Sequence, residues 1–477
     1  MLFNSYSFIF LFIPIVWLGF RFFSYRGLLR GALIWLTVSS FCFYAYWNPP
    51  FIFLLLFSIG FNFYIAKLLN KGNLHRKWFL LLGVIVNLAF IAYFKYGNFI
   101  MSNIYALSYS HWVSKDVFLP LGISFFTFQQ IAFLVEVYQG EIVASSLLDY
   151  SLFVSFFPQL IAGPIVRYPE IVPFFSKKKF FTMNYKNVAL GLFLFSVGLA
   201  KKVIIADSLS PWVSPIFDRA EPLQFWSAWS GALAYTFQIY FDFSGYSDMA
   251  LGLGKLFNIN LPINFNSPYK ALSITDFWRR WHITLSRFLK DYLYIPLGGN
   301  RKGKLAQYRN LLITMTLGGL WHGASWTFVF WGLYHGLLLL GHKVISNLFK
   351  INRHYNKYTV ILKWGVTFFC VTIGWVLFRA HSLTQSIEII KAMLGLKGIS
   401  SFGVSLFREM HFPELLTCLL ICLFVPQSWE IVPFYKNVNN VKAYAFLRSK
   451  IVIAAIVFVL AVVLISTKPT EFLYFQF

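Results

Sequence analysis

Two histidines lie within one of the most apolar stretches of the chain. The segment TLGGLWHGASWTFVFWGLYHG, residues 316–336, contains His322 and His335 among aromatic and aliphatic residues. Glycines flank His322 on both sides, so the backbone can bend there and another group can approach the imidazole closely. An imidazole with an unperturbed pKa of about 6.5 suits a general base at neutral pH. We predict that His322 takes a proton from an attacking hydroxyl, whereas His335 and His342 fit a hydrogen-bonded structural role.

A long basic segment, SITDFWRRWHITLSRFLKDYLYIPLGGNRKGK at residues 273–304, also carries residues able to do chemistry. Apolar side chains recur at helical spacing from Thr275, a predicted N-cap, to Tyr292, which predicts an amphipathic helix at the membrane surface. His282 lies within it. The basic side chains of this helix either anchor it to lipid headgroups or bind an anionic, phosphate-rich donor. These side chains are Arg279, Arg280, Arg287 and Lys290.

Two carboxylates occur near the end of another long apolar stretch. In YFDFSGYSDMALGLGKLF, residues 240–257, they are Asp242 and Asp248. An ionisable side chain inside a membrane span usually faces the protein interior or a cavity. We expect a structural role, in which Asp242 pairs with Lys255 or with a tyrosine and orients a neighbouring group rather than transferring protons.

The chain ends with the aromatic sequence FLYFQF, residues 472–477. Tyrosine is enriched where helices leave the membrane, so one interpretation is an interface anchor. The alternative is that the hydroxyl of Tyr474 accepts the acyl group with the help of His322 and passes it to a partner, which divides one transfer into two. A Tyr474→Phe substitution separates the two interpretations, because it keeps the aromatic ring and deletes only the nucleophile.

Membrane-spanning helices must position all of these residues. The chain of 477 residues is 58% hydrophobic and 21% aromatic but only 12% charged, unlike soluble globular domains. A span needs about 20 mostly apolar residues, and the pattern predicts ten to twelve crossings. The apolar stretch 311–340 is too long for one crossing, so we predict two shorter arms that meet at the glycines beside His322. The predicted fold class is an all-α, polytopic membrane protein with re-entrant and interfacial helices.

The formal charge of +24 is concentrated in the short connections between spans. Such loops face the cytoplasm, where anionic membrane lipid accounts for the charge, so no nucleic-acid partner is expected. The first apolar stretch has no basic residue before Arg21, which predicts a retained span rather than a cleaved signal peptide. The four cysteines lie in apolar segments without metal-ligand spacing, which predicts buried fillers and no metal site.

We find no internal repeat and no Gly/Ser-rich or Pro-rich linker that would divide the sequence. We therefore expect a single domain over 1–477, with core motifs at 240–340 and the aromatic tail at 472–477. GxSxG, P-loop and HExxH motifs, which would offer a competing catalytic site, are absent from the sequence.

Several motifs together resemble the membrane-bound O-acyltransferase superfamily, in particular its bacterial alginate O-acetylation branch, which is related to the peptidoglycan O-acetylation and teichoic acid D-alanylation membrane proteins. The resemblance rests on FWRRWHITLSRFLKDYLYIPLGGNR, on GGLWHGASWTFVFWGLYHG downstream and on YFDFSGYSDMALG upstream. It extends to nearly the whole chain through SYSFIFLFIPI, LPLGISFFTFQQIAFLVEVY, FPQLIAGPIVRYPE and GLAKKVIIAD.

The resemblance implies a ring of transmembrane helices around a central tunnel that runs from the cytoplasm towards the outer face. It places the catalytic histidine at His322 and the second active-site histidine at His282. We expect Trp281, Trp321 and Asp242 to line the tunnel or to orient groups within it. Acetyl-CoA is the first donor expected, and an acyl carrier protein thioester is the second.

The implied activity is O-acyl transfer at the bacterial inner membrane, towards an exported polysaccharide. The implied partners are a periplasmic SGNH-type acetyltransferase, which completes the transfer to sugar hydroxyls, and the polysaccharide biosynthesis or export machinery. Two other classes remain open. Broken helices and buried ionisable groups also mark membrane transporters, although a transporter is expected to show an internal repeat. A non-catalytic scaffold of an export complex needs no histidine at membrane depth.

Overall fold

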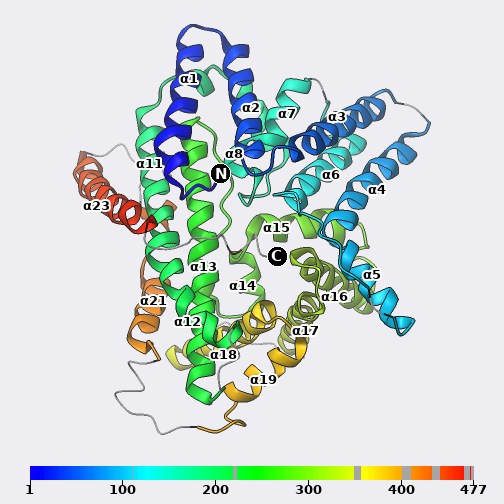
Figure 1. Cartoon of the computed structure of the whole chain (residues 1–477), viewed down its shortest axis with the longest axis vertical. Helices are drawn as coiled ribbons and strands as arrows, with labels where there is room; N and C mark the ends of the chain where they lie inside the picture. The colour runs from blue at the N-terminus through cyan, green and yellow to red at the C-terminus, as the bar shows by residue number, and fades with distance from the viewer. Residues whose placement is uncertain are drawn as a thin grey trace. The chain divides into compact units, whose positions relative to one another are not determined.

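The computed structural model of the chain describes all residues except 73, 111, 145, 219–222, 349–355, 400–409, 432–440, 467–472 and 474–477, with only the backbone of 441–449. Within this described part every regular element is a helix, so the predicted all-α class is confirmed (Figure 1). The residues group into two compact units. Unit 1 comprises Met1–Leu199, Tyr246–Ile263 and Val432–Thr467, and unit 2 comprises Ala200–Gly245, Asn264–Ile431 and Lys468–Phe477. The single domain over 1–477 stays a prediction.

Unit 1 consists mainly of apolar helices that pack side by side. α1 packs on α2, and α4 packs on both α3 and α6 (Figure 1). The helices of this unit are η1 (Ser7–Phe12), α1 (Ile13–Tyr25), α2 (Leu29–Ala45), α3 (Phe51–Asn70), α4 (Arg76–Phe94), α5 (Gly97–Leu107), α6 (Ile123–Gln139), α7 (Leu147–Ser155), α8 (Phe157–Leu160), α9 (Tyr168–Phe175), α10 (Lys178–Phe181), α11 (Tyr185–Ala200) and α23 (Val441–Ile465).

Buried amide side chains link three helices of unit 1. Asn87 Nδ2 on α4 donates a hydrogen bond to Asn62 Oδ1 on α3 at 2.6 Å, and Asn62 Nδ2 donates to Asn87 Oδ1 at 3.3 Å. Asn62 Nδ2 also donates to Gln130 Oε1 on α6 at 2.9 Å, and Gln130 Nε2 donates to Ser58 Oγ at 2.9 Å. All four side chains are buried. Such interhelical hydrogen bonds stabilise packing where lipid offers no polar partner.

Unit 2 contains the segments that carry both candidate histidines. Within it α16 packs on α17, and α17 also contacts α14 and α18. The helices that lie in this unit or begin in it are η2 (Lys201–Ala206), α12 (Asp207–Phe217), α13 (Phe225–Leu256), η3 (Pro268–Lys270), α14 (Ile274–Arg280), α15 (Ile283–Leu289), η4 (Lys290–Tyr294), α16 (Gly303–His322), α17 (Trp326–Leu348), α18 (Lys357–Arg379), α19 (Leu383–Met393), α21 (Phe412–Phe424) and α22 (Ser428–Ile431).

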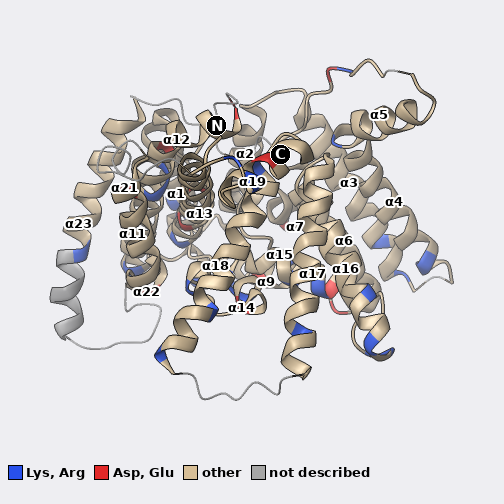
Figure 2. Cartoon of the chain, turned by 90° about the horizontal axis from the view of Figure 1, so that it is seen from below, with Lys and Arg blue, Asp and Glu red and all other residues tan. Residues whose placement is uncertain are grey.

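The described helices make the chain a multi-pass membrane protein, as predicted. Lys and Arg, blue in Figure 2, occur near the ends of helices such as α4 and α16. Three shorter helices are also apolar, at Leu29–Ala45, Phe412–Phe424 and Lys450–Ile465, and the count of ten to twelve crossings stays a prediction. The six helices long and apolar enough to span are Ser7–Tyr25, Phe51–Asn70, Arg76–Phe94, Tyr185–Phe217, Trp326–Leu348 and Lys357–Arg379.

The apolar stretch 311–340 folds as two packed helices, α16 and α17, that meet at residues 323–325, which confirms the predicted break (Figure 1). His322 is the last residue of α16. The two helices approach closely at a pair of glycines. A Cβ added to Gly319 would lie 2.8 Å from Gly332 Cα and 2.3 Å from the carbonyl oxygen of Phe328. Small residues allow backbones to come this near in membrane proteins.

Gly319→Ala is expected to destabilise the protein, because the added methyl group meets backbone atoms that cannot rotate away. Overpacking of this kind costs about 1–3 kcal/mol. A lower midpoint of thermal unfolding in detergent would show the effect. Gly341→Ala on α17 is the control, since a Cβ there meets nothing within 4 Å. Equal midpoints for the two variants would contradict the close packing of α16 on α17.

The prediction that all four cysteines are buried fillers is wrong for two of them. Cys418 and Cys422 are buried, but Cys370 is only half-buried and Cys42 is exposed. The apolar surroundings of Cys42 in the sequence belong to a helix of a membrane protein, and an apolar residue on such a helix can face lipid as readily as the core.

Candidate active site

The basic segment does not form one amphipathic helix from Thr275 to Tyr292, as predicted, but two short helices, α14 and α15, followed by η4. The N-cap of α14 is Ser273 rather than Thr275, because Ser273 Oγ accepts a hydrogen bond from the backbone N–H of Asp276 at 3.1 Å. The Thr275 hydroxyl instead lies 3.0 Å from His342 Nδ1 on α17, which gives His342 the hydrogen-bonded role predicted for it.

Hydrogen bonds from Asn264, in the segment before α14, hold the break between α14 and α15. Asn264 Oδ1 accepts from the backbone N–H of Thr284 at 3.3 Å and from its hydroxyl at 2.7 Å. The Asn264 carbonyl accepts from the backbone N–H of Ile283 at 3.0 Å. His282, at the break, has a left-handed backbone with φ 43°, which is uncommon for a residue other than glycine. Tertiary contacts therefore override the helical spacing of the sequence here.

This break places His282 near the end of α16. The His282 imidazole is fully buried and packs edge-on against Phe243, with ring centroids 4.8 Å apart. It also meets the ring of Trp321 at 6.3 Å, and Trp321 meets the ring of His322 at 5.0 Å. His322 is buried as well. The structure thus brings together His282, His322 and Trp321, three of the residues predicted for the site.

Trp281, the other tryptophan predicted to line the site, belongs to an aromatic cluster. Its ring lies 4.7 Å from that of Trp375, 5.0 Å from that of Phe265 and 5.7 Å from that of Phe277. The side chain is buried. In this position Trp281 fixes the C-terminal end of α14, and with it the break at the following residue.

Burial lowers the pKa of His282 from its usual 6.5 to about 3. His282 lies outside the candidate spans, between α14 and α15. Its imidazole is therefore neutral at physiological pH and can donate one hydrogen bond and accept another. This protonation state fits a group that polarises a carbonyl, and it does not fit a base whose pKa must lie near the working pH.

The low pKa of His282 makes stability depend on pH. The neutral ring is favoured in the folded state, so its stabilising contribution is present above pH 6.5 and is lost as the pH falls towards 3. His282→Asn should reduce the loss of thermal stability between pH 7 and pH 5, by up to about 1.4 kcal/mol per pH unit below 6.5. Asn is the suitable replacement because it tolerates the left-handed backbone. The same pH dependence in both proteins, measured by thermal unfolding in detergent, would contradict a buried neutral ring.

The expected pairing of Asp242 with Lys255 is wrong. Asp242 does not pair with Lys255, whose Nζ donates to Asn260 Oδ1, but lies with its Oδ1 2.7 Å from Lys202 Nζ. Both partners are buried. Sequence spacing favoured Lys255 because it lies on the same stretch, whereas Lys202 comes from the GLAKKVIIAD motif far upstream. The carboxylate therefore joins two motifs that the sequence left unconnected.

The four basic residues predicted to bind a donor differ in their surroundings. Arg279 and Lys290 are exposed, and Arg287 is half-buried. Arg280 forms an ion pair with Asp276 at 2.8 Å and donates to the Asn266 carbonyl at 3.2 Å. Arg280 therefore serves the local fold of α14, and the exposed residues are the better candidates to meet an anionic ligand.

His335 is buried, but the hydrogen-bonded role predicted for it is wrong. Within the described part of the chain neither ring nitrogen has a hydrogen-bond partner. The ring is enclosed by Trp331 at 4.9 Å and Trp278 at 5.2 Å. The absence of a side chain at Gly374 leaves room for the His335 ring, since a Cβ at Gly374 would lie 2.7 Å from His335 Nε2. The Trp331 ring also contacts the His322 ring at 5.1 Å, so the same indole contacts both His335 and the candidate base.

Most of the aromatic tail lies outside the described residues, including Tyr474. Leu473 is described and buried, and its backbone N–H donates to Asp242 Oδ2 at 3.2 Å. No pattern in the sequence indicates that Asp242 and the tail are in contact.

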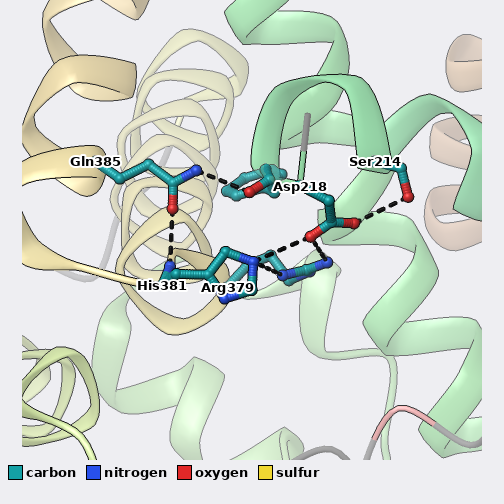
Figure 3. Close-up of polar contacts among 6 residues, drawn as sticks. Ser214, Asp218, Arg379, His381 and Gln385 are labelled. Atoms are coloured by element: carbon teal, nitrogen blue, oxygen red, sulfur yellow. Dashed lines mark hydrogen bonds and ion pairs between the residues drawn. The ribbon is translucent and has the colours of Figure 1, made fainter. Parts of the chain in front are cut away.

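A second polar cluster, shown in Figure 3, lies where α12 ends and α19 begins. Arg379 pairs with Asp218, Ser214 Oγ donates to Asp218 Oδ2 at 2.9 Å, and His381 Nε2 lies 3.1 Å from Asp218 Oδ1. Gln385 Oε1 accepts from the backbone N–H of His381 at 2.8 Å. Burial raises the pKa of Asp218, but Arg379 and the hydrogen bonds outweigh it and hold the pKa below its usual value. This cluster ties α12, α18 and α19 together.

Known proteins resemble the chain over most of its length. The profile described as the membrane-bound O-acyltransferase family matches residues 78–380, which include both His282 and His322. A peptidoglycan O-acetyltransferase of Helicobacter pylori is 46% identical over 430 residues, covering 84% of this chain and 81% of that protein. A probable alginate O-acetylase AlgI of Pseudomonas aeruginosa is 40% identical over 462 residues, covering 93% and 84%. A teichoic acid D-alanyltransferase of Bacillus subtilis is 28% identical over 275 residues, covering 54% and 68%.

Proposed function

Because the chain belongs to the membrane-bound O-acyltransferase family and is an O-acyltransferase, we propose that it moves an acetyl group from a cytoplasmic thioester towards an exported polysaccharide. Two similar proteins support an acetyl group and a polysaccharide, since they are named for the O-acetylation of peptidoglycan and of alginate. The named relatives are bacterial, which supports the inner membrane as the location. The family assignment alone gives O-acyl transfer, and the proposal adds the donor, the acceptor and the direction of transfer out of the cytoplasm.

The observation that carries the proposal is the contact of two buried imidazoles, His282 and His322, with the single indole of Trp321. In the proposed reaction His322 takes the proton of the acceptor hydroxyl, and the oxygen of that hydroxyl attacks the thioester carbonyl. Neutral His282 donates a hydrogen bond to the carbonyl oxygen, where negative charge develops. The C–S bond then breaks, and the proton passes from His322 to the leaving thiolate.

We propose acetyl-CoA as the donor, with an acyl carrier protein thioester as the second candidate. The Tyr474 hydroxyl is the proposed first acceptor, and its acetyl ester is passed to a periplasmic SGNH-type acetyltransferase. That partner completes the transfer to sugar hydroxyls, beside the polysaccharide biosynthesis or export machinery. A covalent relay of this kind divides one long transfer into two shorter ones.

The proposed function is tested with the purified chain in lipid vesicles, given radiolabelled acetyl-CoA or radiolabelled acetyl-acyl carrier protein. Label on the chain and release of the free thiol are expected with acetyl-CoA. If the chain consumes neither thioester, the proposed donor class is overturned. In cells, deletion of the chain should lower ester-linked acetate on peptidoglycan or on an extracellular polysaccharide, and unchanged acetate on both would overturn the acceptor class.

Donor binding should depend on the exposed charge of α14. Arg279→Gln together with Arg280→Gln is expected to weaken donor binding by up to about 30-fold at low salt, since exposed ionic contacts contribute at most about 1 kcal/mol each. The difference should shrink as salt rises, because such contacts are screened. Arg280→Gln alone is the control, and should account for the smaller part because Arg280 is paired with Asp276. Unchanged donor affinity of the inserted double variant would favour a lipid anchor.

A further inference from the structure

Three segments far apart in the sequence meet at one buried ionic cluster in unit 2. Lys202 Nζ lies 2.7 Å from Asp207 Oδ1 and 2.7 Å from Asp242 Oδ1. The other oxygen of Asp242 accepts the hydrogen bond from the backbone N–H of Leu473. Asp242 is 1% exposed, Lys202 is 3% exposed and Leu473 is 8% exposed, so this contact with the tail is made inside the protein.

We propose that Lys202, Asp207 and Asp242, here named the tail seat, hold the C-terminal tail at Leu473 and thereby position Tyr474 for the histidine pair. The part that concerns Tyr474 rests on the proposed function. The seating of the tail itself does not. In this proposal Asp242 is a positioning residue that acts on the acceptor and takes no part in proton transfer.

The charges of the tail seat explain why it binds a backbone amide. Two carboxyl groups and one ammonium group leave one net negative charge when both carboxyls are ionised. A buried charge is costly unless hydrogen bonds and opposite charges compensate for it. Lys202 contacts one oxygen of Asp242, and the Leu473 N–H contacts the other. A hydrogen bond to an ionised acceptor is roughly twice as strong as a neutral one, and Lys202 beside Asp242 favours the ionised form of the carboxyl group.

The seat also lies close in the chain to the candidate active site. Phe243 follows Asp242 on α13 and packs against the His282 ring at 4.8 Å. Tyr474 follows Leu473 directly, and consecutive Cα atoms are about 3.8 Å apart. Fixing Leu473 on α13 therefore restricts where the Tyr474 hydroxyl can go. An aromatic tail that serves only as a membrane anchor gains nothing from contact with a buried carboxylate.

The test uses a cysteine reporter, Gln476→Cys, labelled by a membrane-impermeant maleimide in intact spheroplasts, with the parent chain as the background. Leu473→Pro removes the donating N–H without changing the buried cluster, because proline lacks this hydrogen. Leu473→Ala is the matched control, since it also shortens the side chain but keeps the N–H. We expect labelling about tenfold or more faster with proline than with alanine, the scale of one hydrogen bond to a charged group. Equal rates in the two variants would overturn the seat.

A second pair of variants approaches the same contact from α13. Asp242→Ala removes the carboxylate that accepts the Leu473 hydrogen bond and leaves Lys202 paired with Asp207. Asp248→Ala removes another buried carboxylate of the same helix. Only Asp242→Ala is expected to speed labelling of the tail, and a rate equal to that of Asp248→Ala would overturn the seat. Faster labelling with undiminished acetyl transfer would support the tail seat and overturn its role in positioning Tyr474.

Discussion

His322→Ala is expected to lower acetyl transfer by about 100-fold or more, the scale of a lost general base. The expectation follows from the position of the ring, which is buried at the end of α16 and surrounded by the rings of Trp321, Trp331 and Phe378. Alanine keeps the helical backbone and removes only the group that accepts the proton. The measurement is the rate of thiol release from acetyl-CoA by the purified variant in vesicles.

His342→Ala is the matched control for this prediction. His342 lies on the same pair of packed helices, and its ring hydrogen-bonds to Thr275 rather than facing Trp321. Its loss should leave the rate within a few-fold of the parent. Near-normal transfer by His322→Ala at normal membrane abundance would remove the catalytic role. Normal acetate on the exported polymer of cells carrying His322→Ala would then fit a transporter or a scaffold, both of which should tolerate the substitution.

Tyr474→Phe is expected to abolish acetylation of the exported polymer while leaving the abundance and membrane insertion of the chain unchanged. The phenylalanine ring keeps the aromatic character of the tail, but it offers no oxygen to form an ester with the acetyl group. Acetate released from purified polymer by mild alkali measures the effect in cells. Mass spectrometry of the C-terminal peptide of the parent chain should detect an acetylated tyrosine.

Phe475→Tyr provides the control for the tail, since it retains Tyr474 and changes the neighbouring ring by one hydroxyl. It should acetylate the polymer as the parent does. Full acetylation by Tyr474→Phe would leave the tail as an interface anchor and require another acceptor for the group activated by His322.

The sequence predicted those features that depend on local composition and on backbone freedom. The helical class follows from long apolar runs, and the break at His322 follows from the glycines that flank it. The structure confirms both. The proximity of His282 and His322 was implied only by the resemblance to a family, because no spacing rule connects a residue of the basic segment with the end of a distant helix.

The remaining features depend on contacts between distant segments. Helical spacing predicted one helix through His282, whereas hydrogen bonds from Asn264 interrupt it. The partner of Asp242 was sought among its neighbours in sequence, but Lys202 and Leu473 reach it from other parts of the chain. A carboxylate in an apolar stretch indicates that a partner is needed, but the sequence alone does not show which segment supplies it.

The paired amides of α3 and α4 have a consequence for how the chain enters the membrane during synthesis. An asparagine in the middle of a span raises the cost of inserting that span alone. Asn62 and Asn87 satisfy each other reciprocally, and they lie on helices joined by a short connection. The two spans can therefore leave the translocon as a hairpin before Gln130 has been synthesised. Asn62→Leu would ease insertion of α3 alone and would remove a hydrogen-bond partner of Asn87 on α4.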